Sequence, residues 1–289
     1  MSINFDNVTY TYMPGTPYQR TAIQNINLVI NKGEFVGIIG HTGSGKSTLV
    51  QHMNGLIAPT SGQVTIDGID LATKSLAARQ VRRQVGMVFQ YPEHQLFEET
   101  IYQDIAFGPK NLDLTEDQIE TRIRRAMEFV GLDYDTFKDR SPFNLSGGQM
   151  RRVAIAGVIA LEPDYLALDE PAAGLDPCGR DEIFGQIVQL HQKTGITVIL
   201  VSHNMEDIAR FASRVLVMNN GQISLDGLPK EIFSSGREKL QEAGVDVPPI
   251  TALIDKFRAK GLAISNDVMT AEAAAKGIYQ AVRGRKNAH

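Results

Sequence analysis

The stretch Gly40-His41-Thr42-Gly43-Ser44-Gly45-Lys46-Ser47 fits the pattern of a phosphate-binding loop, and it directly follows the apolar, strand-like run at residues 35–39. Its glycines let the backbone fold back with its N–H groups pointing inward, and a helix starting near Lys46 adds its positive dipole end. Lys46 is expected to reach the β- and γ-phosphates, the Ser47 hydroxyl to bind Mg²⁺, and Thr48 to contact the α-phosphate side. A glycine-rich turn can match this pattern by accident, so the remaining parts of a nucleotide site must appear further along the chain.

The composition is that of an ordinary globular protein. The 289 residues are 43% hydrophobic and 21% charged, which suits one large domain and an appendage. The net charge is −4 and the only basic tract lies at residues 283–286, so nucleic acid is not an expected partner. The single cysteine, Cys178, excludes an internal disulfide and a four-thiolate metal site, and it fits a reducing compartment.

The sequence has no apolar run of about 18 residues, and residues 1–6 lack the regions of a signal peptide. We therefore expect a cytoplasmic protein. If it works at a membrane, another protein must hold it there.

Two kinds of strand pattern predict two sheets. Alternating or β-branched runs, the last followed by an Asp67-Gly68 turn, predict a small antiparallel sheet beside the phosphate loop: residues 3–10, 22–30 and 63–66. Continuous apolar runs separated by helical patterns predict a parallel sheet covered on both faces: residues 85–89, 165–169 and 196–201. Ligands bind at the carboxyl ends of such parallel strands.

Helical periodicity replaces the strand signal between residues 91 and 161, notably over 116–130 and 150–160. This predicts a helical subdomain of about residues 91–161 inserted into the core of the sheet. The fold class is therefore α/β.

The C-terminal part of the chain predicts a helical appendage. A hairpin with Asn220-Gly221 at its turn closes the core, giving a main unit over residues 1–228 and an extension over 229–289. Within the extension, Pro248-Pro249 precedes a helix with one apolar stripe, and residues 271–282 form a second helical stretch. The sequence leaves open whether the extension packs, dimerises or regulates.

Two carboxylates, Asp169 and Glu170, stand where an apolar strand ends. Asp169 is expected to hold Mg²⁺ through its water shell, and Glu170 to polarise the water that attacks the γ-phosphate. Two solvated acids at a strand end are common in isolation. A phosphate loop in the same chain favours the nucleotide interpretation.

Gln90 and His203 follow two other strands at the same predicted edge. Gln90 is expected to bind Mg²⁺ or its water, and His203 to contact the γ-phosphate. A histidine after a strand is more often a packed or surface residue, but its position at the ligand edge favours the phosphate contact.

The run Leu145-Ser146-Gly147-Gly148-Gln149 precedes the predicted helix at 150–160. Ser146 and Gln149 have capping-box spacing, and the two glycines leave the helix N-terminus open to an anion. Alone, this run would be a helix cap and nothing more.

Taken in order, the phosphate loop, Gln90, residues 145–149, Asp169-Glu170 and His203 resemble the ATP-binding cassette family over residues 1 to about 228. The resemblance implies a P-loop NTPase fold with a RecA-like parallel sheet, and ATP and Mg²⁺ as cofactors. It also implies a dimer closed head to tail around two nucleotides, in which the signature residues would serve the partner's ATP: Ser146, Gly147, Gly148 and Gln149.

Two further positions take their expected roles from this resemblance. Tyr12 matches the aromatic residue that stacks on adenine, with Tyr10 as the alternative, and both also suit cross-strand packing. Asp176, in Gly174-Leu175-Asp176, would connect the two ATP sites.

A finer resemblance is to the energy-coupling-factor ATPases, and four segments carry it: residues 40–44, 88–97, 104–109 and 150–157. It implies ATP-driven uptake of vitamins or transition metals through an integral membrane coupling protein and small substrate-binding membrane subunits. Residues 91–100 look most like the second ATPase of a heterodimeric pair. Residues 91–107 would then form the groove for the coupling protein, the alternative being a segment that packs within its own subdomain.

One departure from the family pattern is Asn204, where many cassette ATPases carry an acid. Glu170, His203 and the signature residues are all present, so we expect hydrolysis at the cytoplasmic face of the membrane. Other interpretations remain: a cobalt or nickel importer, an exporter, or a soluble cassette protein acting on ribosomes or DNA. The last usually has two cassettes or a long coiled-coil insertion, and this chain has neither.

Overall fold

The computed structural model describes residues 1–265 and 268–286, and it contains two sheets. The smaller one is antiparallel, with strand order β2-β1-β4-β5. Its strands are β1 Ser2–Tyr12, β2 Arg20–Asn31, β4 Ser61–Ile66 and β5 Ile69–Asp70. The predicted antiparallel sheet is confirmed, and Asp67-Gly68 forms the turn between β4 and β5.

The larger sheet has six strands in the order β10-β9-β3-β8-β7-β6. All neighbours are parallel except the β9–β10 hairpin, which turns at Asn220-Gly221 as the sequence predicts. Its strands are β3 Phe35–Ile39, β6 Val85–Val88, β7 Tyr165–Asp169, β8 Thr197–Val201, β9 Arg214–Asn219 and β10 Gln222–Gly227.

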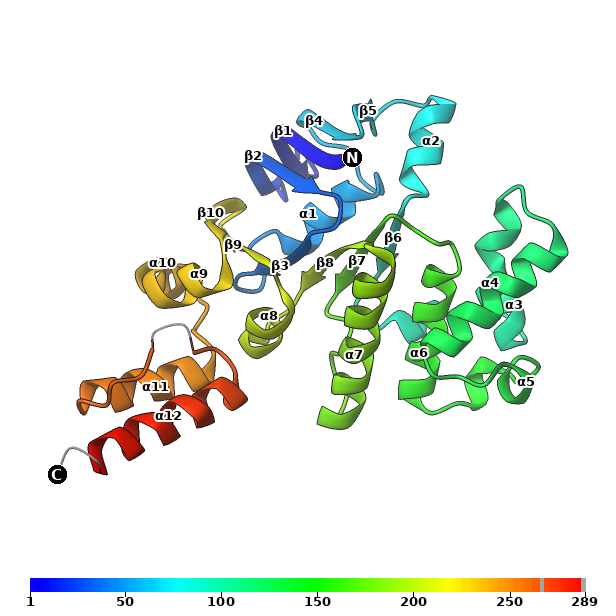
Figure 1. Ribbon diagram of the computed structural model, residues 1–289. Coiled ribbons are helices and arrows are strands. Elements are labelled where there is room, and N and C mark those ends of the chain that lie inside the picture. The colour runs from blue at the N-terminus through cyan, green and yellow to red at the C-terminus, as the bar shows by residue number, and fades with distance from the viewer. Residues whose placement is uncertain (266–267, 287–289) are drawn as a thin grey trace.

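Helices and the small sheet cover the two faces of the large sheet, which explains its continuous apolar strands. On one face lie α1, Lys46–Met53, and the small sheet, and on the other lie α7, Pro177–Thr194, and α8, Met205–Phe211 (Figure 1). Consecutive strand residues belong to different cores: Ile38 is in the cluster that contains Leu49 of α1, whereas Ile39 is in the cluster that contains Phe184 of α7. The predicted parallel sheet with two covered faces is confirmed.

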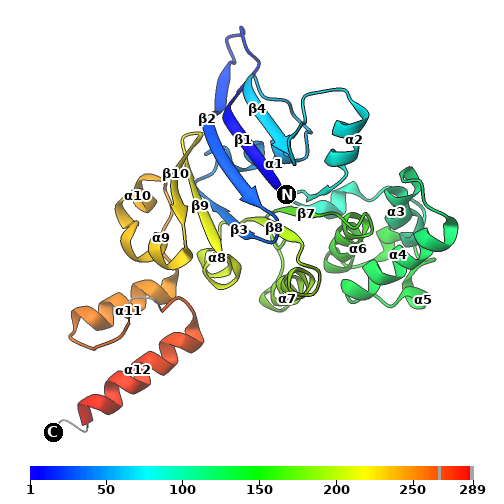
Figure 2. The same cartoon turned by 45° about the horizontal axis from the view of Figure 1, so that its top comes forward.

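A group of helices stands beside β6 and is linked to the sheet through β6 and β7 (Figure 2). After α2, Leu76–Arg82, and β6, the chain contains no strand until β7, and this whole interval is described. The elements are η1 Pro92–Gln95, α3 Ile101–Phe107, η2 Pro109–Asn111, α4 Glu116–Phe129, α5 Tyr134–Phe137, η3 Pro142–Asn144 and α6 Gly147–Ile159. Capping boxes begin α3, α4 and α6, and the predicted inserted helical subdomain is confirmed.

The chain ends in a helical extension, as predicted, and its two halves differ in packing. The helices are α9 Pro229–Ser235, α10 Arg237–Glu242, α11 Pro249–Ala259 and α12 Ala271–Lys286. Phe233 and Leu240 belong to the same core as the large sheet, whereas Ile254 and Ala274 belong to a separate small cluster. α11 and α12 project away from the sheets in both views (Figures 1 and 2). The predicted limit at residue 228 stays a prediction, and residues 266–267 and 287–289 of the extension lie outside the described part.

Among the described residues, no helix combines the length and the apolar character needed to cross a membrane.

Candidate nucleotide site

The phosphate loop connects the end of β3 to the start of α1, and its geometry requires glycine. Gly40 has a φ of 152° and Gly45 a φ of 105°. A Cβ atom would lie 2.3 Å from the carbonyl oxygen of Met218 at position 40, and 2.5 Å from that of Ala22 at position 45. The loop is therefore held tightly between β2 and β9.

Lys46 is 6% exposed and folds back over its own loop. Its Nζ donates to the carbonyl oxygens of Gly40 (2.9 Å) and His41 (3.0 Å). Burial lowers the pKa of Lys46, and the negative charges of Glu170 and Asp169 act in the opposite direction.

Two other loop residues, Ser44 and His41, differ in their surroundings. The buried Ser44 Oγ has no hydrogen-bond partner within the described residues. The His41 N–H donates to the carbonyl oxygen of Ala243 (3.1 Å), and its Nδ1 donates to that of Thr42 (2.8 Å). The loop thus touches the C-terminal extension at its outer tip.

The inner side of the loop opens into a pocket of about 180 Å³. Its lining residues are Tyr12, Arg20, Ala22, Gly43, Gly45, Lys46, Ser47 and Thr48.

Tyr12, not Tyr10, belongs to this pocket. The Tyr12 hydroxyl lies 3.2 Å from the Thr48 hydroxyl, and the side chain is 39% exposed. Tyr10 instead packs edge-to-face on His52, with 5.1 Å between the ring centroids. Of the two alternatives, the structure places only Tyr12 where a base could stack.

Asp169, at the end of β7, lies next to the loop and accepts a hydrogen bond from Ser47. It is 7% exposed. Burial raises the pKa of Asp169, while the hydrogen bond from Ser47 and the charge of Lys46 oppose this rise. Two of the three groups predicted to hold Mg²⁺, Ser47 and Asp169, are therefore already in contact.

Three side chains from the ends of three neighbouring strands meet at Glu170. Oε1 of Glu170 lies 2.7 Å from Nε2 of His203, and its Oε2 accepts a hydrogen bond from Nε2 of Gln90 (3.4 Å). Glu170 has a φ of 52°, a left-handed conformation that is uncommon for a residue other than glycine. The turn after β7 thus holds the carboxylate between its two neighbours.

The signature residues lie in the helical subdomain and line neither the loop pocket nor the hollow beside Glu170 and His203. Ser146 is the N-cap of α6 and forms the predicted capping box with Gln149, with bonds of 3.0 and 3.3 Å. A Cβ at Gly147 would meet nothing within 4 Å, so this helix end is open. Asp176 caps α7 by accepting from the Gly179 N–H (2.7 Å), and no bond links it to a nucleotide motif among the described residues.

Sequence reasoning missed Arg20. This residue lies opposite Tyr12 in the β1–β2 pairing, lines the loop pocket and donates to the carbonyl oxygen of Gly43 (3.5 Å). The signal was the hairpin register, because an arginine paired with the base-stacking position must face the same pocket. Asn204, the departure from the family pattern, caps α8 by accepting from the N–H groups of Glu206 and Asp207.

A glycine-rich loop between a parallel strand and a helix, with carboxylates at the end of a nearby strand, defines the class of P-loop nucleotide-binding proteins. A family model described as "ABC transporter" matches residues 23–173. Energy-coupling factor transporter ATP-binding protein EcfA2 of Clostridium perfringens is 54% identical, covering 98% of this chain and 99% of the relative. The protein of the same name from Clostridium tetani is 55% identical, covering 97% of each.

Solved structures agree with these relatives. The structure of cbiO1 from Clostridium perfringens, described as part of the ABC transporter complex cbiONQ, has a TM-score of 0.73 and 38% identity, covering 88% of this chain and 98% of that one. A dimeric bacterial ABC transporter cassette, MJ0796, has a TM-score of 0.70 and 31% identity, covering 78% and 98%. The chain belongs to the ATP-binding cassette family, and within it to the energy-coupling factor transporter ATP-binding proteins. It is an ATPase that binds ATP, and the predicted family is confirmed.

Proposed function

We propose that this chain is the ATP-hydrolysing subunit of a membrane importer of the energy-coupling-factor type. The observation that carries the proposal is the meeting of Gln90, Glu170 and His203 beside the phosphate loop, in a chain that matches transporter ATP-binding proteins over nearly its full length. Such a convergence supplies what ATP hydrolysis needs, namely a phosphate cradle and a carboxylate at its edge.

The loop residues 40–48 bind the phosphates, and Lys46 neutralises their charge by giving up its two carbonyl bonds. Ser47, Asp169 and Gln90 offer the hard oxygen atoms that Mg²⁺ prefers, and Ser47 already contacts Asp169, so the donor set fits this ion. When bound, Mg²⁺ neutralises charge on the β- and γ-phosphates.

Glu170 is the general base that polarises the attacking water, and Gln90 and His203 flank its carboxylate. His203 also contacts the γ-phosphate when ATP is bound. Tyr12 stacks on adenine, and Arg20 lies on the same wall of the pocket.

The active form is a dimer closed head to tail, most simply a heterodimer with a related second ATPase. The signature residues 146–149 lie away from the loop of their own chain, at an open helix end that can bind an anion. In the dimer, this helix end would contact the ATP that is bound to the phosphate loop of the partner. Asp176 would connect the two ATP sites. The MJ0796 cassette is itself dimeric.

An exposed aromatic surface supports a membrane partner. Tyr91, Phe97 and Phe107 are all exposed, and Phe97 packs edge-to-face on Phe107 with 5.1 Å between the centroids. A contiguous patch of exposed apolar side chains on a protein surface often marks an interaction site. We therefore assign residues 91–107 to the groove for an integral coupling protein, which holds the chain at the cytoplasmic face of the membrane.

In this arrangement, small membrane subunits bind the vitamin or other micronutrient, and ATP-driven closure of the dimer moves the helical subdomains against the coupling protein. Nucleic acid is not among the proposed partners, because the net charge is −4.

The variant Glu170→Gln tests the chemical part of the proposal. Removing the base should lower ATP hydrolysis by about 100-fold or more, because general base catalysis contributes on the order of 10²–10⁴. ATP binding should survive, and size-exclusion chromatography with ATP should show accumulation of the closed dimer. Full activity of Glu170→Gln would remove Glu170 as the base.

A further inference from the structure

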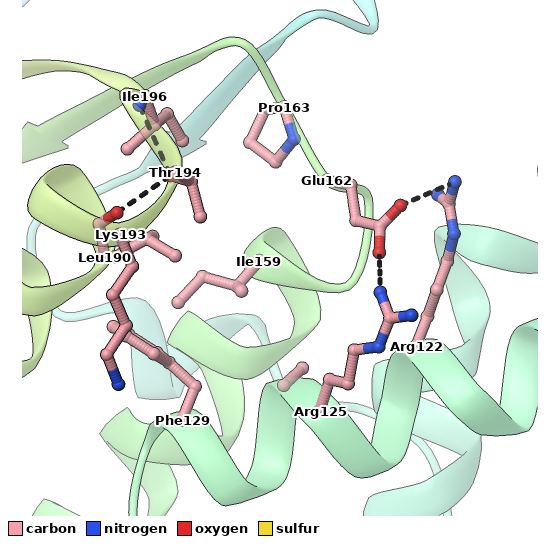
Figure 3. A pocket seen from close by; sticks show the side chains of 11 residues that line it. Arg122, Arg125, Phe129, Ile159, Glu162, Pro163, Leu190, Lys193, Thr194 and Ile196 are labelled. Carbon is pink, nitrogen blue, oxygen red and sulfur yellow. Dashed lines mark hydrogen bonds and ion pairs between the residues drawn. The ribbon is translucent and has the colours of Figure 1, made fainter.

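A large hollow shares no lining residue with the nucleotide site. It is a pocket of about 410 Å³, and its wall comes from α4, the end of α6, the segment after it and the end of α7 (Figure 3). The lining residues are Arg122, Arg125, Ala126, Phe129, Ile159, Glu162, Pro163, Leu190, Lys193, Thr194 and Ile196. We call it the α4–α7 pocket.

The interior of the α4–α7 pocket is apolar. Phe129, Ile159 and Leu190 face the same space in Figure 3, and Ala126 and Pro163 complete the apolar wall. A volume of this size with a mostly apolar lining and a few polar groups is the usual character of a small-molecule site.

The charges around this apolar space are mainly positive. On one side, a single carboxylate, Glu162, pairs with two arginines, at 2.9 Å from Arg122 and 3.0 Å from Arg125. Lys193 lies on the opposite side (Figure 3). Arg122 and Arg125 also line an adjoining polar hollow that contains Asp117, which forms no ion pair with either of them in the described chain.

Lys193 is the lining cation that has no carboxylate partner of its own among the described residues. It is exposed, and within the part of the chain that the structure describes it forms no ion pair. A ligand with an anionic group beside Lys193 would be attracted by the positive charge of this lysine. The apolar part of the same ligand would fill the pocket.

We propose that the α4–α7 pocket binds an anionic amphiphile, with its apolar body against Phe129, Ile159 and Leu190 and its carboxylate beside Lys193. Binding buries the apolar body of the ligand and the apolar lining of the pocket away from water, which favours binding. The positive charge of Lys193 favours a negatively charged head group. None of the nucleotide-site residues lines this pocket.

The position of the pocket gives occupancy a structural consequence. α4 belongs to the inserted helical subdomain, and α7 covers a face of the large sheet. A ligand that contacts both α4 and α7 stabilises the observed position of the helical subdomain relative to the large sheet. The affinity for the ligand therefore changes if the helical subdomain moves relative to the sheet.

The test uses the purified full-length chain in detergent-free buffer, and decanoate and decanol below their aggregation limits as probes. Isothermal titration should show decanoate binding to the unmodified chain at one site. Lys193→Glu turns an attraction into a repulsion and should weaken decanoate binding about tenfold while leaving decanol binding unchanged. Lys110→Glu makes the same charge change at an exposed lysine of the helical subdomain outside the pocket, and should change neither.

A second variant tests the apolar wall. Leu190→Asn should weaken decanoate and decanol alike, and its melting temperature checks that the fold is intact. The proposal is overturned if decanoate does not bind, if Lys193→Glu and Lys110→Glu weaken it equally, or if folded Leu190→Asn binds both probes as the unmodified chain does.

Discussion

At the scale of single residues, the site depends on where the parallel strands end. Gln90 follows β6 closely, Glu170 follows β7 and His203 follows β8, and these three strands are neighbours in the sheet. Their approach to one another could therefore be predicted from the order of apolar runs and polar residues. The left-handed conformation of Glu170 could not, because it depends on the turn that fixes the carboxylate between Gln90 and His203.

We predict that His203→Ala slows ATP hydrolysis by about 100-fold, since Glu170 loses the group at 2.7 Å that holds it. ATP affinity should change little, because the phosphate loop and Tyr12 are untouched. A steady-state assay with separate measurement of nucleotide binding checks both.

The neighbouring substitution Asn204→Asp is the matched control for His203→Ala. Aspartate caps a helix as well as asparagine does, so α8 and the hydrolysis rate should be preserved. If Asn204→Asp slowed hydrolysis as much as His203→Ala, the effect would belong to the turn and not to the histidine.

At the scale of elements, one buried arginine links three of the segments that carry the site. Arg151 of α6 is 3% exposed and pairs with the 15% exposed Glu93 of η1, with nitrogen–oxygen distances of 2.8 and 3.0 Å. It also donates to the carbonyl oxygen of Ala173 (2.5 Å), three residues after Glu170. The signature helix, the segment after Gln90 and the turn after Glu170 are thereby connected.

We predict that Arg151→Met lowers the free energy of unfolding by about 2–3 kcal/mol, because it leaves the partly buried Glu93 carboxylate without its partner. Denaturant titration measures the change. Arg124→Met is the matched control, since its i,i+4 pair with Glu120 is exposed and contributes little to stability. Equal effects of the two substitutions would contradict the role given to Arg151.

The same pair predicts a dependence on pH. Burial acts to raise the pKa of Glu93, but the hydrogen bonds and charge of Arg151 outweigh it, so the pKa lies below its ordinary value. A depressed carboxyl pKa in the folded state stabilises the fold above the unfolded pKa and ceases to do so as the pH falls. Below about pH 4.5, the difference in stability between the unmodified chain and Arg151→Met should therefore shrink.

Helices and strands were more predictable than their contacts. The spacing of Ser146 and Gln149 predicted the cap of α6, and continuous apolar runs predicted the central strands, because both signals are local. The ion pair between Arg151 and Glu93 joins residues far apart in the sequence, and no local pattern indicates it.

At the scale of the whole molecule, the core does not end where the last strand does. Ile232, Phe233 and Leu240 follow β10 and are buried in the same cluster as the large sheet. Ile254 of α11 and Ala274 of α12 belong to a separate cluster. Sequence periodicity predicted helices here, but not which of them pack on the core. An apolar stripe indicates that one face of a helix is buried, and it does not specify the surface against which that face packs.

We predict that a chain ending at residue 248 keeps the stability of the cassette, whereas one ending at residue 228 loses about 5 kcal/mol or more. The second truncation removes three large buried side chains, each contributing about 1.5–3 kcal/mol. Thermal or denaturant unfolding of the two fragments distinguishes them. Equal stability of both would show that α9 and α10 are dispensable to the core.

The proteins that bind this chain in the membrane decide most directly whether it is the ATPase subunit of an energy-coupling-factor importer. The measurement is purification of the tagged full-length chain from native membranes in mild detergent, followed by mass spectrometry. We predict a second cassette ATPase, an integral coupling protein and one or more small membrane subunits that identify the substrates. A complex of two permeases with a soluble binding protein, or no membrane partner, would contradict the transport assignment while leaving the ATPase chemistry in place.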